Sequence, residues 1–417
     1  MIPPQMPFHD YKWRWASVEL TESLNDPAVF LGCLRVLWEN RGRKPNSPEV
    51  TSGLDRVERE LKGRVSTRLR LVRPTEDRNI FRNSQQYWKA LGVLQDTRGT
   101  RGIILTPFGD AVADGRVTQV EFSTTIVATL ELPNRAIMNQ QEIERWDSAG
   151  LRIRPLLLIL EVMRKLGARF GEQQAFLTCD ELIRIVIPLA GERTATMNEY
   201  IDSISAFRNG HLSFQGWPNC APESNDRRMA REFLLFLSHY GFCSYTKGAT
   251  NSQDCFAIQE GFAADLQAIV ELPAIQIENR MQVAEQVRET GAAVFVERQR
   301  TMRPVLQRPQ QSKFRRDVLG AYMSECLITH ERIPETLEAA HIIPVEYRGP
   351  DSVGNGICLR SDIHSLFDSG HLRINPHGQL VFSGAVRSSA NYRNLPPQIH
   401  VPQFLLTDAL EWRWRYQ

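Results

Sequence analysis

The sequence has no long apolar run, no secretory leader and no paired cysteines. No apolar stretch approaches the roughly 20 residues that cross a bilayer, so we expect no contact with a membrane. The amino terminus, Met-Ile-Pro-Pro-Gln-Met-Pro-Phe, lacks the basic region and apolar core of a signal peptide. The seven cysteines are scattered and include no Cys-x-x-Cys pair, which argues against a disulfide framework. Together these absences predict a cytoplasmic protein.

The chain also has little net charge. A formal net charge of +2 gives no global sign of nucleic-acid binding. Locally, basic residues are dense from Lys62 to Arg101 and from Arg298 to Arg316, and such faces are what phosphate neutralisation requires. Solvated helix faces would give the same two runs, so both interpretations stay open. As DNA contacts in the first run we predict Arg64, Arg68, Arg70, Arg98 and Arg101.

With 417 residues, 42% hydrophobic and 24% charged, the chain is long enough for two or three globular domains. In residues 1–145 we expect helices at 26–46 and 84–94, a turn-rich segment at 96–102, a β-like run at 103–106 and a short helix after Pro107. That order resembles the winged-helix DNA-binding modules of several restriction enzymes. The resemblance implies a DNA-recognition domain, and a generic helical domain is the alternative.

Residues 146–271 repeat this order. Helices are predicted at 156–166, at 176–187 with Thr178 as N-cap and Pro188 beyond the end, and at 227–241, before strand-like runs at 242–245 and 255–258. We therefore expect a second winged-helix-like domain. Residues 272–300 have helical spacing and two prolines follow, so 272–313 is predicted to be a helical linker and hinge before a domain at 314–417.

Histidines cluster near the end of the chain, where five of the nine lie between His330 and His377. Around them we predict a strand at 337–345, a loop at 350–356 and a helix at 359–369, which make a β-loop-β-α unit. His364 and Asp368 are four residues apart on this helix and so share one face. An imidazole and a carboxylate at that spacing can bind one divalent metal and leave positions for water and a phosphate oxygen.

Three motifs in this region occur in a specific order: Glu-Ala-Ala-His-Ile-Ile-Pro, Asn-Gly, and Leu-Arg-Ser-Asp-Ile-His-Ser-Leu-Phe-Asp. They resemble the HNH endonuclease family, in the subgroup built around an Ala-Ala-His-Ile-Ile-Pro strand. Residues 314–322 and 326–329 match the entry helix and first strand of that subgroup. The resemblance implies a ββα-metal nuclease domain, so we expect an α+β multidomain protein with a mostly helical amino-terminal region.

The resemblance also implies roles for four residues. His341 takes a proton from the attacking water, Asn355 steadies the loop and the base, and His364 and Asp368 hold the metal. Phosphodiester hydrolysis needs a nucleophile made from water near pH 7, which suits a neutral imidazole base. It also needs a cation beside the oxygens that gain charge. The expected metal is Mg²⁺ or Mn²⁺.

Two features differ from the family pattern. Many HNH sites carry Asp or His directly before the base as a further metal ligand, whereas this chain has Ala340. Glu338, on the same face of the strand, could substitute directly or through water. Zinc-stabilised relatives use two Cys-x-x-Cys pairs, but neither Cys326 nor Cys358 has a second cysteine three positions on. We therefore expect no structural zinc and interpret both as core residues.

Residues around the motif have less specific signals. Arg348 and Arg360 flank the unit and could touch phosphate. His371 and His377 are predicted to lie in a hairpin. The aromatic segment 411–416 could stack on bases, although packing against the domain is the simpler interpretation.

These features predict a metal-dependent endonuclease of double-stranded DNA whose amino-terminal domains choose the site. A restriction or antiphage-defence setting follows from the resemblance alone. Alternatives are a nuclease that needs modified DNA or a partner protein, and an inactive HNH-fold DNA-binding module. The retained catalytic set argues against the last of these. Staggered cleavage commonly needs two active centres, so a homodimer is a further expectation.

Overall fold

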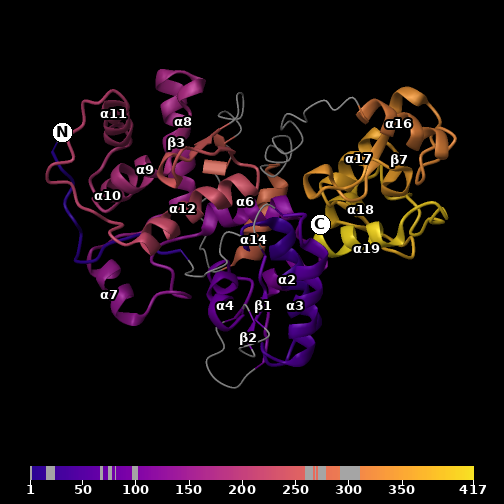
Figure 1. The fold of residues 1–417 in the computed structure, drawn as a ribbon, viewed down its shortest axis with the longest axis horizontal. Coiled ribbons are helices and arrows are strands. Elements are labelled where there is room, and N and C mark those ends of the chain that lie inside the picture. The colour runs from indigo at the N-terminus through magenta and orange to yellow at the C-terminus, as the bar shows by residue number, and fades with distance from the viewer. Residues whose placement is uncertain are drawn as a thin grey trace. The chain divides into compact units, whose positions relative to one another are not determined.

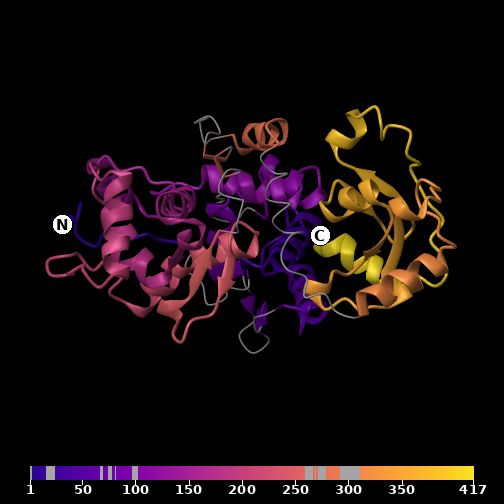
Figure 2. The same cartoon turned by 90° about the horizontal axis from the view of Figure 1, so that it is seen from above.

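The computed structural model describes residues 2–15, 24–65, 69–73, 78–79, 81–95, 102–258, 266–267, 269–270, 279–291 and 310–417. Contacts divide the chain into two compact units that are each discontinuous in sequence; Figures 1 and 2 show their elements. Unit 1 comprises residues 1–26, 80–108 and 120–301, and unit 2 comprises residues 27–79, 109–119 and 302–417. The sequence predicted consecutive domains instead, because local patterns do not reveal that residues 27–79 cluster with the carboxy-terminal part.

Unit 1 is mostly helical. Its aromatic core includes Trp13, Trp15 and Phe233, and the Trp15 and Phe233 rings meet edge to face at 4.6 Å. Two helices have residues in both units: α5 (Pro107–Asp114), and α6 (Gln119–Thr129), whose first residue belongs to unit 2. The longer helices are α4 (Phe81–Ala90), α6 (Gln119–Thr129), α7 (Gln140–Ser148), α8 (Pro155–Phe170), α11 (Met197–Arg208), α12 (Ser224–His239) and α14 (Arg280–Glu289).

A three-stranded antiparallel sheet completes unit 1. Its strands are β3 (Phe176–Thr178), β4 (Ser244–Thr246) and β5 (Cys255–Ala257), in the order β3-β5-β4. Leu177 faces Phe256 in the register, and both side chains are fully buried. The predicted strands near 242–245 and 255–258 are confirmed as β4 and β5, whereas β3 was not predicted.

The helix predicted at 176–187 is confirmed in part: residues 176–178 are a strand instead, and the helical run extends from 179 to 190. After β3 the chain forms α9 (Cys179–Glu181), a π-helical turn (Leu182–Val186) and α10 (Ile187–Ala190). Thr178 is the N-cap, as predicted, and shares a capping box with Glu181. Pro188 lies inside the first turn of α10 rather than beyond a helix end. α10 directly follows the π-helical turn, in which Ile187 donates its amide to the Leu182 carbonyl, and proline removes the next amide donor of the run.

The linker helix predicted at 272–300 is described only between residues 279 and 291. Within that range α14 ends at Glu289, and a turn follows in which Gly291 has φ +69°. Val283, Ala284 and Val287 form the buried face of α14. The spacing therefore predicted the helix correctly but extended it too far.

Unit 2 begins with two packed helices, α2 (Pro27–Glu39) and α3 (Pro48–Leu61), followed by the paired strands β1 (Val72–Arg73) and β2 (Arg78–Asn79). α2 is shorter than the predicted 26–46, because a turn at residues 40–43 contains Gly42 at φ +80°. α3 was not predicted. Ser47 caps it by accepting a hydrogen bond from the amide of Val50.

The carboxy-terminal part of unit 2 contains the predicted β-loop-β-α unit. β6 and β7 pair antiparallel, with Ala339 opposite Cys358 and His341 opposite Gly356, and α17 follows directly. We call residues 337–368 the ββα segment. The helices and strands of the whole carboxy-terminal part are α16 (Gln310–Ala321), β6 (Leu337–His341), β7 (Gly356–Arg360), α17 (Ser361–Asp368), β8 (Leu372–Ile374), β9 (Leu380–Phe382), α18 (Gly384–Ser388) and α19 (Thr407–Tyr416).

Two boundaries and one predicted strand differ here from the structure. β6 ends at His341 rather than at 345, since the chain turns before Pro344. α17 begins at Ser361 rather than at 359, because Arg360 is extended and belongs to β7. Residues 326–329 form a turn instead of a first strand. The hairpin expected around His371 and His377 is confirmed as β8–β9.

The aromatic segment at the end of the chain forms α19 and packs on the protein. Trp412 and Tyr416 are buried, and the Tyr416 ring lies so close to Gly32 of α2 that a Cβ there would sit 2.6 Å from it. Packing, the simpler of the two interpretations, is thus confirmed. Among the described residues, no helix is both long enough and apolar enough to cross a bilayer.

Candidate active site

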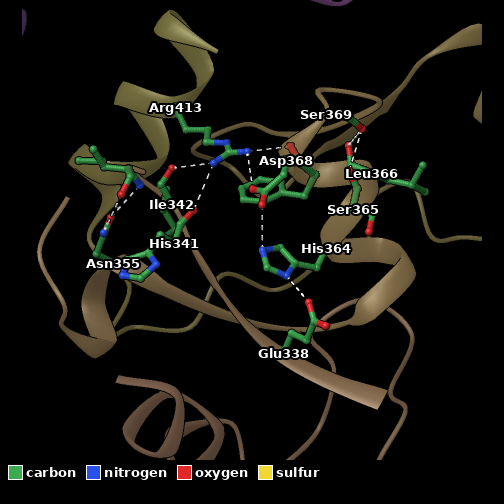
Figure 3. Close-up of polar contacts among 12 residues, drawn as sticks. Glu338, His341, Ile342, Asn355, His364, Ser365, Leu366, Asp368, Ser369 and Arg413 are labelled. Carbon is green, nitrogen blue, oxygen red and sulfur yellow. Dashed lines mark hydrogen bonds and ion pairs between the residues drawn. The ribbon is translucent and has the colours of Figure 1, made fainter. Parts of the chain in front are cut away.

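The ββα segment gathers the four predicted site residues from adjoining elements (Figure 3). His341 ends β6, Asn355 directly precedes β7, and His364 and Asp368 lie on α17. The hairpin orients them because its apolar side chains are anchored in the core: Leu337, Ala340, Ile357 and Leu359 are all fully buried. The polar side chains of the site are therefore held in place by the buried apolar face of the hairpin.

His341 is held on two sides. Its ring stacks on Phe314 of α16, with centroids 3.8 Å apart and 13° between the planes. Its Nε2 lies 2.9 Å from Oδ1 of Asp351. Burial lowers the pKa of His341, and the hydrogen bond and charge of Asp351 offset only part of this. The imidazole is therefore neutral at pH 7 and able to accept a proton. Asp351 was not predicted, because it lies in a loop with no periodic signal.

Asn355 is fully buried and holds the loop between the two strands. Its Oδ1 accepts the amide of Ile343 at 2.8 Å, and its Nδ2 donates to the carbonyls of Ile343 and Pro350, each at 3.1 Å. The chain is tight here, since a Cβ at Gly349 would lie 1.8 Å from the Ile343 carbonyl oxygen. The residue thus fixes the backbone on both sides of the loop that carries Asp351.

His364 lies between two carboxylates. Its Nδ1 is 2.5 Å from Oε2 of Glu338, and its Nε2 is 3.1 Å from Oδ2 of Asp368. Burial lowers the pKa of His364, but the two carboxylates outweigh burial and raise it to about 9. Burial likewise raises the pKa of Asp368, while His364 and Arg413 lower it to about 2. At pH 7 this row is therefore an imidazolium flanked by two carboxylates.

Arg413 of α19 joins the strand and the helix, and sequence reasoning missed it. Its Nη1 donates to the carbonyls of His341 and Ile342 at 3.2 and 3.1 Å. Its Nη2 donates to the Phe367 carbonyl at 2.7 Å and to Oδ1 of Asp368 at 3.2 Å. No local pattern could have indicated these contacts, because Arg413 lies many residues after the motif. In the sequence it is simply one charged residue within an aromatic helical segment.

The ability of these residues to hold a metal can be tested on the distances. In the part of the chain that the structure describes, no three His, Cys, Asp or Glu side chains are arranged as a metal site. A pair is available in His364 Nε2 and Asp368 Oδ2, at 3.1 Å. Two adjacent ligands of an octahedral cation, each about 2.1 Å from it, are separated by about 3 Å. Once His364 loses its proton, the pair therefore fits a cation.

Glu338 occupies a different position in this arrangement. Its carboxylate holds Nδ1 of His364, on the far side of the ring from Asp368. Carboxylates behind metal-bound histidines take this outer position, where they fix the ring and its tautomer. The geometry thus gives Glu338 a contact with the predicted ligand His364.

The two motif cysteines are core residues. Cys326 and Cys358 are fully buried, and burial raises the pKa of Cys358 to about 11. Sγ of Cys326 accepts hydrogen bonds from the amides of Thr329 and Arg360, at 3.4 and 3.2 Å. Both sulfur atoms are therefore core groups, and that of Cys326 also joins the turn at 326–329 to the end of β7.

The arginines predicted to contact phosphate differ in their surroundings. Arg64 donates to the Tyr347 carbonyl at 3.1 Å, which brings it beside Arg348, an exposed residue. The charge of Arg360 is already matched by Asp362, at 2.6 Å. Arg70 is exposed. Three further predicted contacts lie outside the described residues: Arg68, Arg98 and Arg101.

Comparison with protein families identifies the part of the chain that contains these residues. Residues 326–375 match the family model described as HNH endonuclease. This segment is an HNH domain. The HNH domain includes both strands, α17 and β8, and it ends before α19, so Arg413 lies outside the matched residues.

Comparisons of the whole chain with curated proteins and with solved structures identify no family. No curated protein matches it. One solved structure is titled "Crystal structure of pyrene- and phenanthrene-modified DNA in complex with the BpuJ1 endonuclease binding domain". It is similar over 71% of this chain and 98% of that chain, with 14% sequence identity and a TM-score of 0.44.

Proposed function

We propose that this protein is a metal-dependent endonuclease that hydrolyses phosphodiester bonds of double-stranded DNA. The observation that carries the proposal is a neutral histidine held by a carboxylate, His341 with Asp351, in the same site as the His364–Asp368 pair. Arg413 bonds both the backbone of His341 and the carboxylate of Asp368, so the two pairs belong to one centre.

His341 is the general base in this proposal. With Nε2 directed at Asp351, Nδ1 is the nitrogen that takes the proton from the attacking water. Asp351 fixes the tautomer and stabilises the imidazolium that forms. Phe314 keeps the ring from rotating because the two rings stack. Asn355 contributes by holding the loop that carries Asp351.

His364 and Asp368 are the proposed ligands of Mg²⁺ or Mn²⁺. When bound, such a cation stabilises the charge that develops on the phosphate and leaving oxygens. We propose that Glu338 orients His364 from behind rather than acting as a ligand, since it already bonds Nδ1. Nitrogen and oxygen donors without a thiolate suit these two metals.

Recognition is assigned to unit 1. The order α8, β3, helices, β4 and β5, with β5 central, supports a winged-helix arrangement. Two exposed arginines at the start of α12, Arg227 and Arg228, give this region a basic surface. Exposed Lys247 beside β4 adds to it, and Tyr245 is 40% exposed for stacking. We propose that this surface contacts the DNA backbone.

The setting we propose is restriction of foreign DNA, with two copies acting on one duplex. This rests on the HNH domain and on the need for two active centres in a staggered cut. Phage plating on cells that express the protein, compared with His341→Ala, tests the setting. Sedimentation with and without a cleavable duplex tests the dimer.

A cleavage assay tests the central proposal. Supercoiled plasmid incubated with the protein should be nicked or linearised with Mg²⁺ or Mn²⁺, and EDTA should stop the reaction. A fresh excess of Mn²⁺ should restore it, which separates chelation from damage. Undiminished cleavage in EDTA would contradict the assignment of His364 and Asp368.

A further inference from the structure

Arg413 is a buried cation whose donors reach two elements of the active site. It is 6% exposed, and its guanidinium lies 3.9 Å from the centre of the Phe367 ring. One nitrogen bonds two carbonyls at the end of β6, and the other bonds the last turn of α17 and Asp368. The planar fork of arginine can reach acceptors on both sides at once, whereas a lysine ammonium is a single point.

The helix that carries Arg413 is fixed to a different part of unit 2. Tyr416 donates to Oε2 of Glu60 at 2.7 Å, and Arg415 forms an ion pair with the same carboxylate. Gly32 of α2 leaves the space that the Tyr416 ring fills. α19 therefore lies between the ββα segment and the α2–α3 pair.

A second buried arginine fastens α19 from β8. Nη2 of Arg373 donates to the Trp414 carbonyl at 2.8 Å, and its guanidinium lies 3.9 Å from the Trp414 ring centre. Its Nη1 donates to the Asp114 carbonyl at 2.9 Å. α19 is consequently held by α2, α3 and β8 through residues that lie outside the proposed site.

We infer that Arg413 is a positioning residue for His341 and Asp368, and that α2 and α3 maintain this positioning through α19. The inference rests on the proposed nuclease function and adds to it a dependence of the HNH domain on residues outside the family match. Without Arg413, the end of β6 and the end of α17 lose the hydrogen bonds that this side chain makes to both. A displacement of about 1 Å between base and ligand is enough to cost about 100-fold in rate.

The test compares Arg413→Met, Arg413→Lys and the matched control Arg332→Met in the full-length protein. Arg332 is exposed and pairs with Glu325 at the edge of the same part of the chain. We expect Arg413→Met to lose about 100-fold in cleavage rate at saturating DNA with its DNA affinity unchanged. Arg413→Lys should recover only part of the rate, and Arg332→Met should behave as wild type.

A second readout does not depend on cleavage. Hydrogen–deuterium exchange should accelerate in the peptides covering 341–343 and 364–369 of Arg413→Met, with the rest of the chain unchanged. If wild type does not cut DNA but this exchange change occurs, the proposed function fails and the positioning role stands. Unchanged exchange, or cleavage within a few-fold of wild type, overturns the inference. Should the Met variant not fold, the same two criteria apply to Arg413→Lys.

Tyr416→Phe examines the link to α3. It removes only the hydroxyl that bonds Glu60, so the fold should persist. We expect a loss of a few-fold in rate with faster exchange in 341–343, and equal rates and exchange would overturn the part assigned to α2 and α3.

Discussion

Arg208 in unit 1 and Arg413 in unit 2 make nearly the same set of contacts. Arg208 bonds the carbonyls of Gln174 and Phe176, pairs with Glu181 and lies 3.7 Å from the Phe176 ring centre. Arg413 bonds three carbonyls, pairs with a carboxylate and lies over a phenylalanine in the same way. Each fork thus fastens separate segments of backbone together.

The two forks differ in what else their carboxylate does. The second oxygen of Glu181 accepts the Thr178 amide at 2.8 Å, and Glu181 is 2% exposed. The second oxygen of Asp368 faces His364, and the Asp368 side chain is 38% exposed. A backbone amide cannot release its proton near neutral pH, but an imidazolium can. One arginine is therefore part of a permanent structural joint, and the other holds a carboxylate beside the imidazolium that we propose exchanges its proton for a metal.

The largest effect on the cleavage rate is expected for the proposed general base, His341. His341→Ala should reduce the cleavage rate by about 100-fold to 10,000-fold, because a positioned base contributes that much to the transition state. DNA affinity should stay the same, since the base adds little to ground-state binding. Single-turnover cleavage and a filter-binding assay measure the two quantities. His377→Ala is the matched control, as it lies in the β8–β9 turn. A variant cutting within a few-fold of wild type would show that the base is another residue.

Arg208, which pairs with the buried Glu181, should affect the stability of unit 1 rather than the cleavage rate. Arg208→Met leaves Glu181 buried without its cation, so we expect the free energy of unfolding of unit 1 to fall by about 3–5 kcal/mol. Folded molecules should still cut at the wild-type rate. Denaturant unfolding with matched rate measurements tests this. Arg169→Met, in an exposed pair with Asp202, should cost under about 1 kcal/mol. A Glu181 pair no more sensitive than the exposed one would remove the contrast between the forks.

The row formed by Glu338, His364 and Asp368 should make metal binding depend on pH. Without metal the pKa of His364 is about 9, so at pH 7 a proton occupies the nitrogen that the cation needs. Apparent Mn²⁺ affinity should rise about tenfold per pH unit toward pH 9 and then level off. Titration of Mn²⁺ into DNA-free protein from pH 6.5 to 9.5 measures this. An affinity independent of pH over that range would mean that His364 is not a ligand.

The smallest effect concerns the carboxylate behind the base. Asp351→Asn should slow cleavage by about tenfold, as loss of an outer orienting partner typically does. Since Asp351 raises the pKa of His341, its removal should lower that pKa further. The rate of wild type should fall only at a pH below the usual range of histidine protonation, because burial lowers the pKa of the base. In Asp351→Asn this fall should begin at a lower pH. An unmoved pH profile would separate Asp351 from the base.

Local sequence could predict the ββα segment but not its surroundings. His341, Asn355, His364 and Asp368 follow from a motif of short range, in which strand, loop and helix are consecutive. Asp351 and Arg413 carry no such signal: one lies in an irregular loop, and the other acts from a helix formed by a later segment.

The same limit explains the errors in unit 1. Residues 176–178 have helix-like neighbours, yet they pair with β5, which lies far along the chain. Tertiary pairing therefore overrode the local pattern. The grouping of residues 27–79 with the carboxy-terminal part was hidden for the same reason, since Gly32 and Glu60 meet Tyr416 only in three dimensions.

The position of α19 in the chain has a consequence for synthesis. A ribosome makes the ββα segment before it makes Arg413, and domains form progressively from the amino terminus. A nascent chain can therefore contain every HNH motif while the end of β6 and the end of α17 are still unjoined. Cutting competence would arise late, once α19 has docked against helices that were made first. Under the proposed function, the nuclease would become active only after α19 is made, so active fragments would not accumulate in the cell.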